Sequence, residues 1–465
     1  MTSASGAPTL VEPLARVFDH GWLAAVLPAD ARRFRVADPG LAAVLSDAGA
    51  ELVEENADVD IAPASELRGE ADLAVVSFAA RPHDSTHLAV RVGKRLVSAA
   101  EVRVKALHAR RIVSSKGYPR SDAVFWDVRQ KFFLPGERRG DRELVEFLPQ
   151  RALVLGRRSP PAPTLLAAAL TAAGQAVETT LEAAPPTIRA GLVATLTDKG
   201  LLRVAVGPAR RQLEEQLKAL DALRAMRVES LVADRVPWPL AKGRSGLADW
   251  SLEQLLPGTR PPGGLDSELL AQCVDFLVAL HGSGGSDRAS SLRDDANSVA
   301  ALRPPEHAEA LRELGRRLES DLAGVARGFG HGDFFLGNLL TEGKRLTGVV
   351  DWDAGGPGRL PLLDLLHLLH LAQYPLGDED WGPTIARHLL PWARSGGDDV
   401  VREYSRRIGL DADPRLLESL AIAYWLDRVA YTLRTHRQRR VEPRWMARNV
   451  DLVVEATAGY REAAS

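Results

Sequence analysis

Three polar residues in one segment have the types and the spacing that metal-assisted phosphoryl transfer requires. Asp333 and Asn338 lie five residues apart within residues 330–340, and Asp351 follows the apolar run 348–350. Transfer from ATP needs a carboxylate that orients the acceptor hydroxyl and accepts its proton, and hard oxygen ligands that hold Mg²⁺ against the phosphates. One tight loop can present the Asp333 carboxylate to the acceptor and the Asn338 amide oxygen to the metal.

Two short strands are expected to position these side chains. Leu339-Leu340 and Val349-Val350 are predicted to pair as buried strands that fix the two loops against each other. Asp351 at the end of the second strand is then placed as a second, stronger Mg²⁺ ligand. Each of the three polar residues alone could simply cap a turn or a strand, but their joint spacing favours a shared site.

The pattern H-G-D-x-x-x-x-N followed by V-V-D-W-D resembles the catalytic and metal-binding segments of the aminoglycoside phosphotransferase and choline kinase-like superfamily. The resemblance runs from residue 165 or so to the C-terminus and implies the bilobal protein-kinase fold, with ATP and Mg²⁺ as cofactors. It implies Asp333 as catalytic base, His331 as an organiser of the loop, and Asn338 and Asp351 as Mg²⁺ ligands. Asp364 resembles the family's Asp at the start of the next helix, where a structural and a functional role are both open.

The resemblance also identifies residues for the nucleotide. Residues 246–258 resemble the interlobe hinge, whose backbone hydrogen-bonds adenine, with Gln254 and Leu255 at the binding position. Arg203 lies on the strand where kinases carry a Lys that holds the phosphates. Arg keeps the positive charge, but its guanidinium is planar and rigid, whereas the Lys ammonium is a point charge. Its partner on the following helix is either Glu214 or Glu215, and the helix register leaves that choice open. No G-x-G-x-x-G phosphate loop precedes these strands.

Three histidines outside this pattern have simpler interpretations. His367 and His370 are spaced i, i+3 on the helix after Asp364 and could share a metal. The surrounding leucines and the lack of an evident third ligand favour a core or interface role. His281 ends an L-x-x-L-H pattern that resembles a family helix end, and we interpret it as a packing residue.

The composition is that of a soluble globular protein. The 465 residues predict two or three packed units, and the net charge of −2 gives no reason to expect nucleic-acid or membrane partners. The single cysteine, Cys273, lies on the apolar side of a predicted helix and is expected to be a buried core thiol. No signal peptide and no membrane-length apolar run is visible, so we expect a cytoplasmic protein.

We predict three segments: an α/β accessory domain at 1–157, a kinase N-lobe with hinge at 158–258, and a mostly helical C-lobe at 259–465. In the first, strands near 33–36, 51–54, 59–61 and 73–76 alternate with helices at 41–48 and 87–109, which predicts a Rossmann-like domain. The turn after residue 38 holds only Gly40, so a dinucleotide fingerprint is missing. Residues 156–164 are a candidate linker.

The later segments also have recognisable patterns. The runs 188–196 and 201–206 predict a β-hairpin around the turn 197–200, and an amphipathic helix follows over 210–226. Helices are further expected over 164–174, 267–281 and 414–436.

The leading hypothesis is ATP- and Mg²⁺-dependent phosphorylation of a hydroxyl on a small molecule: an aminoglycoside or other antibiotic, a sugar or an amino alcohol. The alternative is a pseudokinase-like scaffold that binds nucleotide and leaves the work to the N-terminal domain; retention of Asp333, Asn338 and Asp351 together argues against it. A protein kinase is disfavoured because D-W-D replaces D-F-G. Acidic residues at 378–380 and 398–399 are candidate linings for a cationic acceptor. The acceptor, the choice between ATP and GTP, a homodimer and the role of 1–157 stay open.

Overall fold

The computed structural model describes residues 21–63, 66–79, 107–109, 111–112, 114–117, 124–127, 151–157, 162–183, 187–189, 192–282, 291–374, 381–435 and 437–462. The chain divides into two compact units. One combines Met1–Glu214 with Trp238–Leu255, and the other combines Glu215–Pro237 with Leu256–Ser465. Each unit is described by itself.

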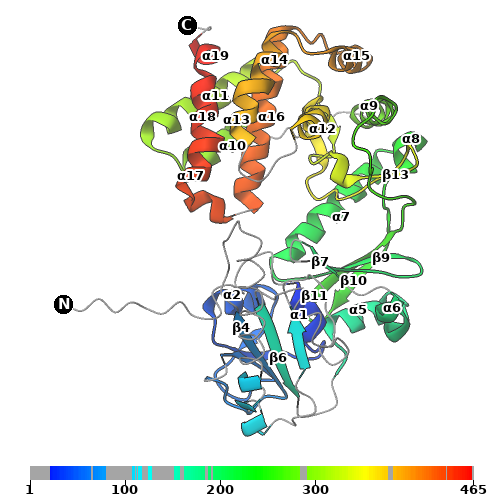
Figure 1. Ribbon diagram of the computed structural model, residues 1–465, viewed down its shortest axis with the longest axis vertical. Coiled ribbons are helices and arrows are strands. Elements are labelled where there is room, and N and C mark those ends of the chain that lie inside the picture. The colour runs from blue at the N-terminus through cyan, green and yellow to red at the C-terminus, as the bar shows by residue number, and fades with distance from the viewer. Residues whose placement is uncertain are drawn as a thin grey trace, which may run out of the picture. The chain divides into compact units, whose positions relative to one another are not determined.

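The first unit begins with a mixed β-sheet. In sheet order, its described strands are β2 (Glu51–Leu52), β1 (Arg33–Val36), β3 (Val59–Ala62), β4 (Leu73–Ala79), β6 (Arg151–Arg157) and β5 (Val124–Asp127). The first four are parallel to one another, whereas β6 is antiparallel to β5 and to β4, beside which it is labelled in Figure 1. Among the described residues of this parallel part, the predicted alternation of strands and helices is seen only between β1 and β2.

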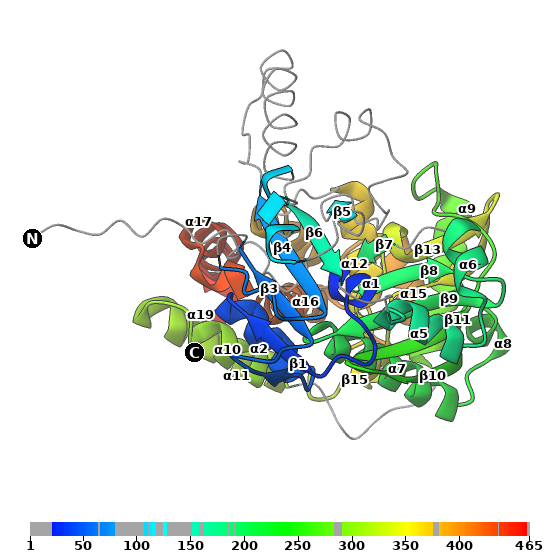
Figure 2. The same cartoon turned by 90° about the horizontal axis from the view of Figure 1, so that it is seen from below.

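One described helix makes a crossover in this sheet. Helix α2 (Pro39–Asp47) connects β1 to β2 and packs beside β1 (Figure 2). The Asp38 carboxylate caps it by accepting a hydrogen bond from the Leu41 N–H, and Pro39 fits the first turn because its missing N–H has no partner to lose there. The second predicted helix, 87–109, lies almost wholly outside the described residues.

A second, antiparallel sheet follows in the same unit. Its order is β10 (Pro239–Ser245), β11 (Ala248–Gln254), β9 (Gly200–Val206), β8 (Leu192–Leu196) and β7 (Thr187–Arg189). Helix α7 (Ala209–Ala225) joins β9 to β10. The predicted hairpin around 197–200 is confirmed, with Leu196 paired to Leu201. The run expected as one strand over 188–196 is instead two antiparallel strands, β7 and β8, with Arg189 paired to Leu192.

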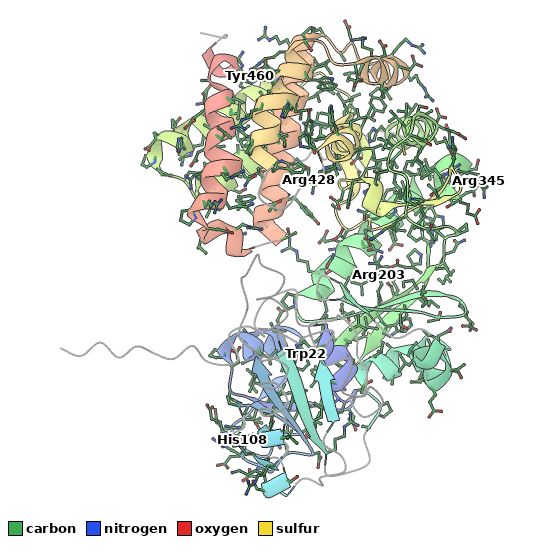
Figure 3. The ribbon with its side chains drawn as sticks, viewed as in Figure 1. Trp22, His108, Arg203, Arg345, Arg428 and Tyr460 are labelled. Carbon is green, nitrogen blue, oxygen red and sulfur yellow. The ribbon has the colours of Figure 1, made fainter. Side chains whose placement is uncertain are left out.

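The two sheets of this unit share one hydrophobic core. Helices α1 (Trp22–Val26) and α5 (Leu165–Ala172) also contribute side chains to this core. One of them, Trp22, is labelled in Figure 3. The buried members from both sides include Trp22, Phe34, Leu41, Leu45, Leu165, Leu170, Val193, Leu202, Val204, Val206, Trp250 and Leu252. The N-terminal α/β part and the antiparallel sheet are thus packed as a continuous interior. The candidate linker 156–164 begins inside β6 and ends at Thr164, the N-cap of α5.

The second unit is mainly helical. Its longer helices are α9 (Ser267–His281), α10 (Leu292–Ala300), α11 (Pro305–Asp321), α12 (Leu363–Gln373), α15 (Asp399–Arg407) and α16 (Pro414–Thr435). Shorter helical segments are α8 (Ser230–Ala233), α13 (Trp381–Thr384), α14 (Leu390–Arg394), α17 (Pro443–Met446), α18 (Leu452–Ala456) and α19 (Ala458–Glu462). Helix α16 packs against α10, α12 and α14 (Figure 1) and buries residues around its whole circumference, as a central helix must.

Two pairs of short strands lie among these helices. They are β12 (Gly328–Gly330) with β15 (Gly356–Arg359), and β13 (Leu339–Glu342) with β14 (Arg345–Val349), each antiparallel. Cys273 on α9 is fully buried as predicted, and burial raises the pKa of its thiol to about 12. Among the described residues, no helix has both the length and the apolar character needed to span a bilayer.

Candidate active site

The candidate catalytic loop leaves β12 at Gly330 and runs through His331, Gly332 and Asp333 to a short 3₁₀ turn, Leu336–Asn338. Gly332 has a φ of +78°, and a Cβ there would lie 2.2 Å from the Ala354 carbonyl oxygen. Only glycine fits this close approach. The loop is therefore held tightly against the segment that follows Asp351.

Asp364 holds the backbone of this loop from the first turn of α12. Its carboxylate accepts the N–H of His331 at 2.7 Å and that of Gly332 at 2.8 Å. His281 Nε2 donates to the same carboxylate at 3.2 Å, and Tyr404 hydrogen-bonds the other ring nitrogen of His281. Burial would raise the pKa of Asp364, but the hydrogen bond from His281 and the nearby Arg359 guanidinium hold it well below its usual range. Asp364 is thus a buried, ionised brace for the loop.

His331 lies fully buried beneath the loop. Its Nε2 donates to the Val350 carbonyl oxygen at 3.0 Å, and its Nδ1 accepts the Asp333 N–H at 3.2 Å. Its ring packs against Trp352 with 4.5 Å between centroids. Burial lowers the pKa of His331, which keeps the imidazole neutral with one donor and one acceptor nitrogen. These contacts are those of a loop-organising residue.

Asp333 accepts hydrogen bonds on both of its carboxylate oxygens. Oδ2 accepts from Asn338 Nδ2 at 3.1 Å, and Oδ1 accepts from His367 Nε2 and from Arg428 Nη1, each at 3.1 Å. Burial would raise the pKa of Asp333, but His367 and the Arg428 guanidinium hold it well below its usual range. The side chain is partly exposed, so it is an ionised carboxylate that a ligand can reach.

The β13–β14 hairpin brings the two candidate metal ligands together. Leu339 pairs with Val349, and the Val350 N–H donates to the Asn338 carbonyl oxygen at 2.9 Å. The predicted pairing of these strands is confirmed. Asn338 uses its Nδ2 on Asp333, and no hydrogen bond from a described residue reaches its Oδ1.

Asp351 sits directly after the hairpin in a strained conformation. Its φ is +63°, in the left-handed region that residues other than glycine seldom adopt. Trp352 anchors the turn, because it is fully buried and its Nε1 donates to the Val349 carbonyl oxygen at 2.8 Å. Strain of this kind persists where the surroundings over-determine it, and it is common at functional sites.

The donor set fits Mg²⁺. An amide oxygen from Asn338 and a carboxylate from Asp351 are hard oxygen ligands, and Mg²⁺ typically takes one or two protein ligands beside waters and phosphates. Within the described parts of the chain, no group of three or more His, Cys, Asp or Glu side chains could hold a metal on its own. An ion here would take water or phosphate oxygens beside these two side chains.

Arg203 forms a buried ion pair in the first unit. Its Nε donates to Glu253 Oε2 at 3.1 Å, and the two side chains are 12% and 1% exposed. Glu253 lies on the neighbouring strand β11 and was missed by the sequence analysis, which sought the partner only on the following helix. On α7, Glu214 is exposed and Glu215 forms an ion pair with Lys218 at 3.5 Å.

Gln254 ends β11, and its N–H donates to the Trp238 carbonyl oxygen. Leu255 follows with an exposed side chain.

Two residues at Asp333 were not anticipated in that role. Arg428 extends from α16 (Figure 3), is buried, and also donates to the Gly332 carbonyl oxygen. Asp333 raises the pKa of Arg428 against the opposing effect of burial, so the guanidinium stays charged. For His367 a core or interface role is predicted; it is buried, and its two ring nitrogens contact Asp333 and Tyr424. His370 instead hydrogen-bonds Thr384 at 2.9 Å.

The model of the phosphotransferase enzyme family matches residues 192–404. The matched segment runs from β8 into α15 and includes Asp333, Asn338 and Asp351.

Solved structures give further similarities. Aminoglycoside 2'-phosphotransferase-IIIa in its GDP complex is 14% identical, with a TM-score of 0.39 and coverage of 58% of this chain and 90% of that one. APH(3'')-Id from Streptomyces rimosus is 18% identical, with a TM-score of 0.38 and coverage of 56% and 96%. A thermostable mutant of APH(4)-Ia is 18% identical, with a TM-score of 0.37 and coverage of 58% and 92%. No curated protein sequence matches the chain.

Proposed function

We propose that the protein transfers the γ-phosphate of ATP, with Mg²⁺, to a hydroxyl of a small molecule. The observation that carries this proposal is the convergence of Asp333, Asn338 and Asp351 in one unit, tied together by the β13–β14 hairpin and the Asn338–Asp333 hydrogen bond. The match of residues 192–404 to the phosphotransferase enzyme family supports the same reaction class.

In this proposal Asp333 orients the acceptor hydroxyl. Its low pKa keeps it ionised, so its partly exposed carboxylate accepts a hydrogen bond from the hydroxyl and fixes the attacking oxygen. Phosphoryl transfer has a loose transition state, so positioning matters more than strong basicity. Arg428 keeps a compensating positive charge beside the carboxylate.

Asn338 and Asp351 hold the metal in this proposal. The Asn338 amide oxygen and the Asp351 carboxylate would hold Mg²⁺, which would supply positive charge to offset the charge that develops on the phosphates. The hairpin register and the left-handed conformation of Asp351 support it, because both keep these two side chains in fixed places before any ligand arrives. His331, buried between the two loops, keeps them in register.

Arg203 is proposed to hold the α- and β-phosphates, with Gln254 and Leu255 at the adenine. The Arg203–Glu253 pair supports a fixed guanidinium, because a hydrogen bond from Nε restrains the fork. The pairing of Arg203 with Glu214 or Glu215 stays a prediction. We propose that residues 1–157 form a Rossmann-like accessory domain, for which the parallel order β2-β1-β3-β4 is the support, and that the protein works in the cytoplasm.

The test is a screen of hydroxylated small molecules with ATP and Mg²⁺, read as phosphorylated product by mass. Aminoglycosides, sugars and amino alcohols form the first panel, with GTP as a second donor. Asp333→Asn keeps the shape of the side chain and should lower turnover by about 10²- to 10⁴-fold, the usual contribution of such a residue. Equal turnover in wild type and Asp333→Asn would refute the assignment. Nucleotide binding without transfer to any acceptor would instead favour the pseudokinase-like scaffold.

A further inference from the structure

Helix α12 contacts the catalytic loop through two side chains on one of its faces. Asp364 and His367 are three residues apart, so they project to the same side of the helix. Asp364 binds the backbone of His331 and Gly332, whereas His367 binds the side chain of Asp333. One rigid element therefore holds both the path of the loop and the orientation of its carboxylate.

We propose that His367, itself held by Tyr424, is the positioning residue that turns the Asp333 carboxylate toward the acceptor hydroxyl. This inference rests on the proposed phosphotransferase function. It adds a role for Tyr424, which lies on α16, beyond the segment 192–404 that matches the family model.

The hydrogen-bond chain has a defined direction. The ionised Asp333 carboxylate can only accept, so His367 Nε2 carries the proton and donates to Oδ1 at 3.1 Å. His367 Nδ1 is then the acceptor of its ring, and the Tyr424 hydroxyl donates to it at 2.9 Å. Tyr424 thus selects the tautomer that Asp333 requires. Second-layer contacts of this kind hold reacting groups within the narrow geometry that fast chemistry needs.

The surroundings keep His367 in place and uncharged. Its imidazole is buried and lies beside Phe335, Trp381 and Tyr424, each with a ring centroid 5.8 Å away. Burial and the nearby Arg428 both lower the pKa of His367. A neutral donor orients Asp333 without adding a second full positive charge beside Arg428, which already neutralises the carboxylate.

The test uses the full-length protein with Mg·ATP and water as the acceptor, and it measures release of inorganic phosphate. His367→Leu removes the hydrogen bond to Asp333 and should lower kcat by about 10- to 100-fold with KM for Mg·ATP unchanged, because misorientation affects the transition state. His367→Gln replaces Nε2–H with an amide donor of similar reach and should recover kcat to within about fivefold of wild type. Tyr424→Phe keeps the aromatic ring but removes the hydroxyl that donates to His367 Nδ1, and it should lower kcat by less than His367→Leu does. If His367→Leu does not fold, Tyr424→Phe tests the same hydrogen-bond chain.

The matched control is His370→Leu. His370 is equally buried and lies one turn further along α12, but its hydrogen bond goes to Thr384. It should lose as much thermal stability as His367→Leu while keeping kcat.

Four outcomes would overturn the proposal. They are a wild-type rate in both His367→Leu and Tyr424→Phe, a loss that His367→Gln does not recover, a loss seen mainly in KM, or an equal loss in His370→Leu. If these occur while Asp333→Asn remains inactive, the phosphotransferase assignment survives and only the role of His367 fails. If wild type releases no more phosphate than Asp333→Asn, and the acceptor screen is also empty, the proposed function fails and this inference with it.

Discussion

Gly332 approaches the Ala354 carbonyl oxygen so closely that a side chain at position 332 has no room. A Cβ would lie 2.2 Å from that oxygen, and the φ of +78° adds backbone strain for any other residue. We expect Gly332→Ala to displace the catalytic loop from the segment after Asp351, to lower turnover at least about 100-fold and to reduce the free energy of unfolding by about 2–4 kcal/mol. Steady-state kinetics and urea unfolding measure the two effects.

Gly343→Ala is the control for this substitution. Gly343 also has a positive φ, +61°, in the turn between β13 and β14, but a Cβ there meets no atom within 4 Å. The free energy of unfolding should fall by only about 1–2 kcal/mol, the cost of a left-handed backbone at alanine, and turnover should be unchanged. Equal kinetic defects in the two variants would mean that the contact with Ala354 does not matter.

The stability that Asp364 contributes should depend on pH. Its folded pKa is well below its usual range, although burial acts the other way. Such a carboxyl stabilises the fold above its unfolded pKa of about 3.9 and loses this contribution as the pH falls toward the folded value. We expect Asp364→Asn to lower the free energy of unfolding by about 2–4 kcal/mol at pH 7. This difference from wild type should shrink below about pH 4.

Urea unfolding followed by tryptophan fluorescence at several pH values measures this difference. Asp399→Asn is the surface control, because Asp399 is fully exposed beside Arg402; it should stay within about 0.5 kcal/mol of wild type. If the difference in the free energy of unfolding between wild type and Asp364→Asn is constant from neutral to acid pH, the stabilisation does not come from an ionised Asp364.

Asp351 should matter for nucleotide binding only when the metal is present. Asp351→Asn retains a side chain that tolerates the left-handed conformation but is a weaker ligand for Mg²⁺. We expect the affinity for Mg·ATP to fall at least about tenfold, and the affinity for ATP in EDTA to change less than about twofold. Calorimetry under both conditions tests this, and a loss of equal size in EDTA would point to a purely structural role.

The Arg203–Glu253 ion pair can be separated from phosphate binding by a double-mutant cycle. Arg203→Met leaves the buried Glu253 carboxylate without this partner and should destabilise the protein by about 3–5 kcal/mol. Adding Glu253→Gln should restore much of that stability, because the buried carboxylate that lost the Arg203 guanidinium is then neutral. If Arg203 also holds phosphates, the double variant stays weak in nucleotide binding. Recovery of both properties would assign Arg203 to the fold alone.

Deleting residues 1–157 should unfold the antiparallel sheet. Val193, Leu202 and Trp250 share their core with Trp22 and Phe34, so the deletion would expose a continuous apolar face. We expect aggregation on expression, as measured by gel filtration. A monomeric fragment 158–465 with normal nucleotide affinity would show that the antiparallel sheet folds without residues 1–157.

Local patterns carried most of the prediction for the catalytic loop. Asp333, Asn338 and Asp351 are joined by one hairpin, and the pairing of Leu339 with Val349 follows from alternation and turn residues within a short stretch. Helix α9 could be bounded as Ser267–His281, because the Asp266 cap and Gly282 are local features. The division of 187–196 into two strands, with Arg189 paired to Leu192, was not predicted.

Contacts between distant segments could not be predicted in this way. Arg428 lies 95 residues from Asp333, and Glu253 lies 50 residues from Arg203, so neither pairing leaves a periodic pattern. His367 was closer to recognition. Its spacing of i, i+3 from Asp364 places both on one helix face, and a helix whose Asp faces the catalytic loop directs that His there too.

The β13–β14 hairpin has a consequence for how this chain can change. The relative places of Asn338 and Asp351 are determined at its paired end, by Leu339 with Val349. The Gly343 turn at the far end is open, so residues inserted there would lengthen the loop without moving either ligand. A single residue inserted between Leu346 and Asp351 would instead rotate every later side chain to the opposite face. The length of this segment can therefore vary at the Gly343 turn, whereas the paired end must keep its register to maintain the spacing of Asn338 and Asp351.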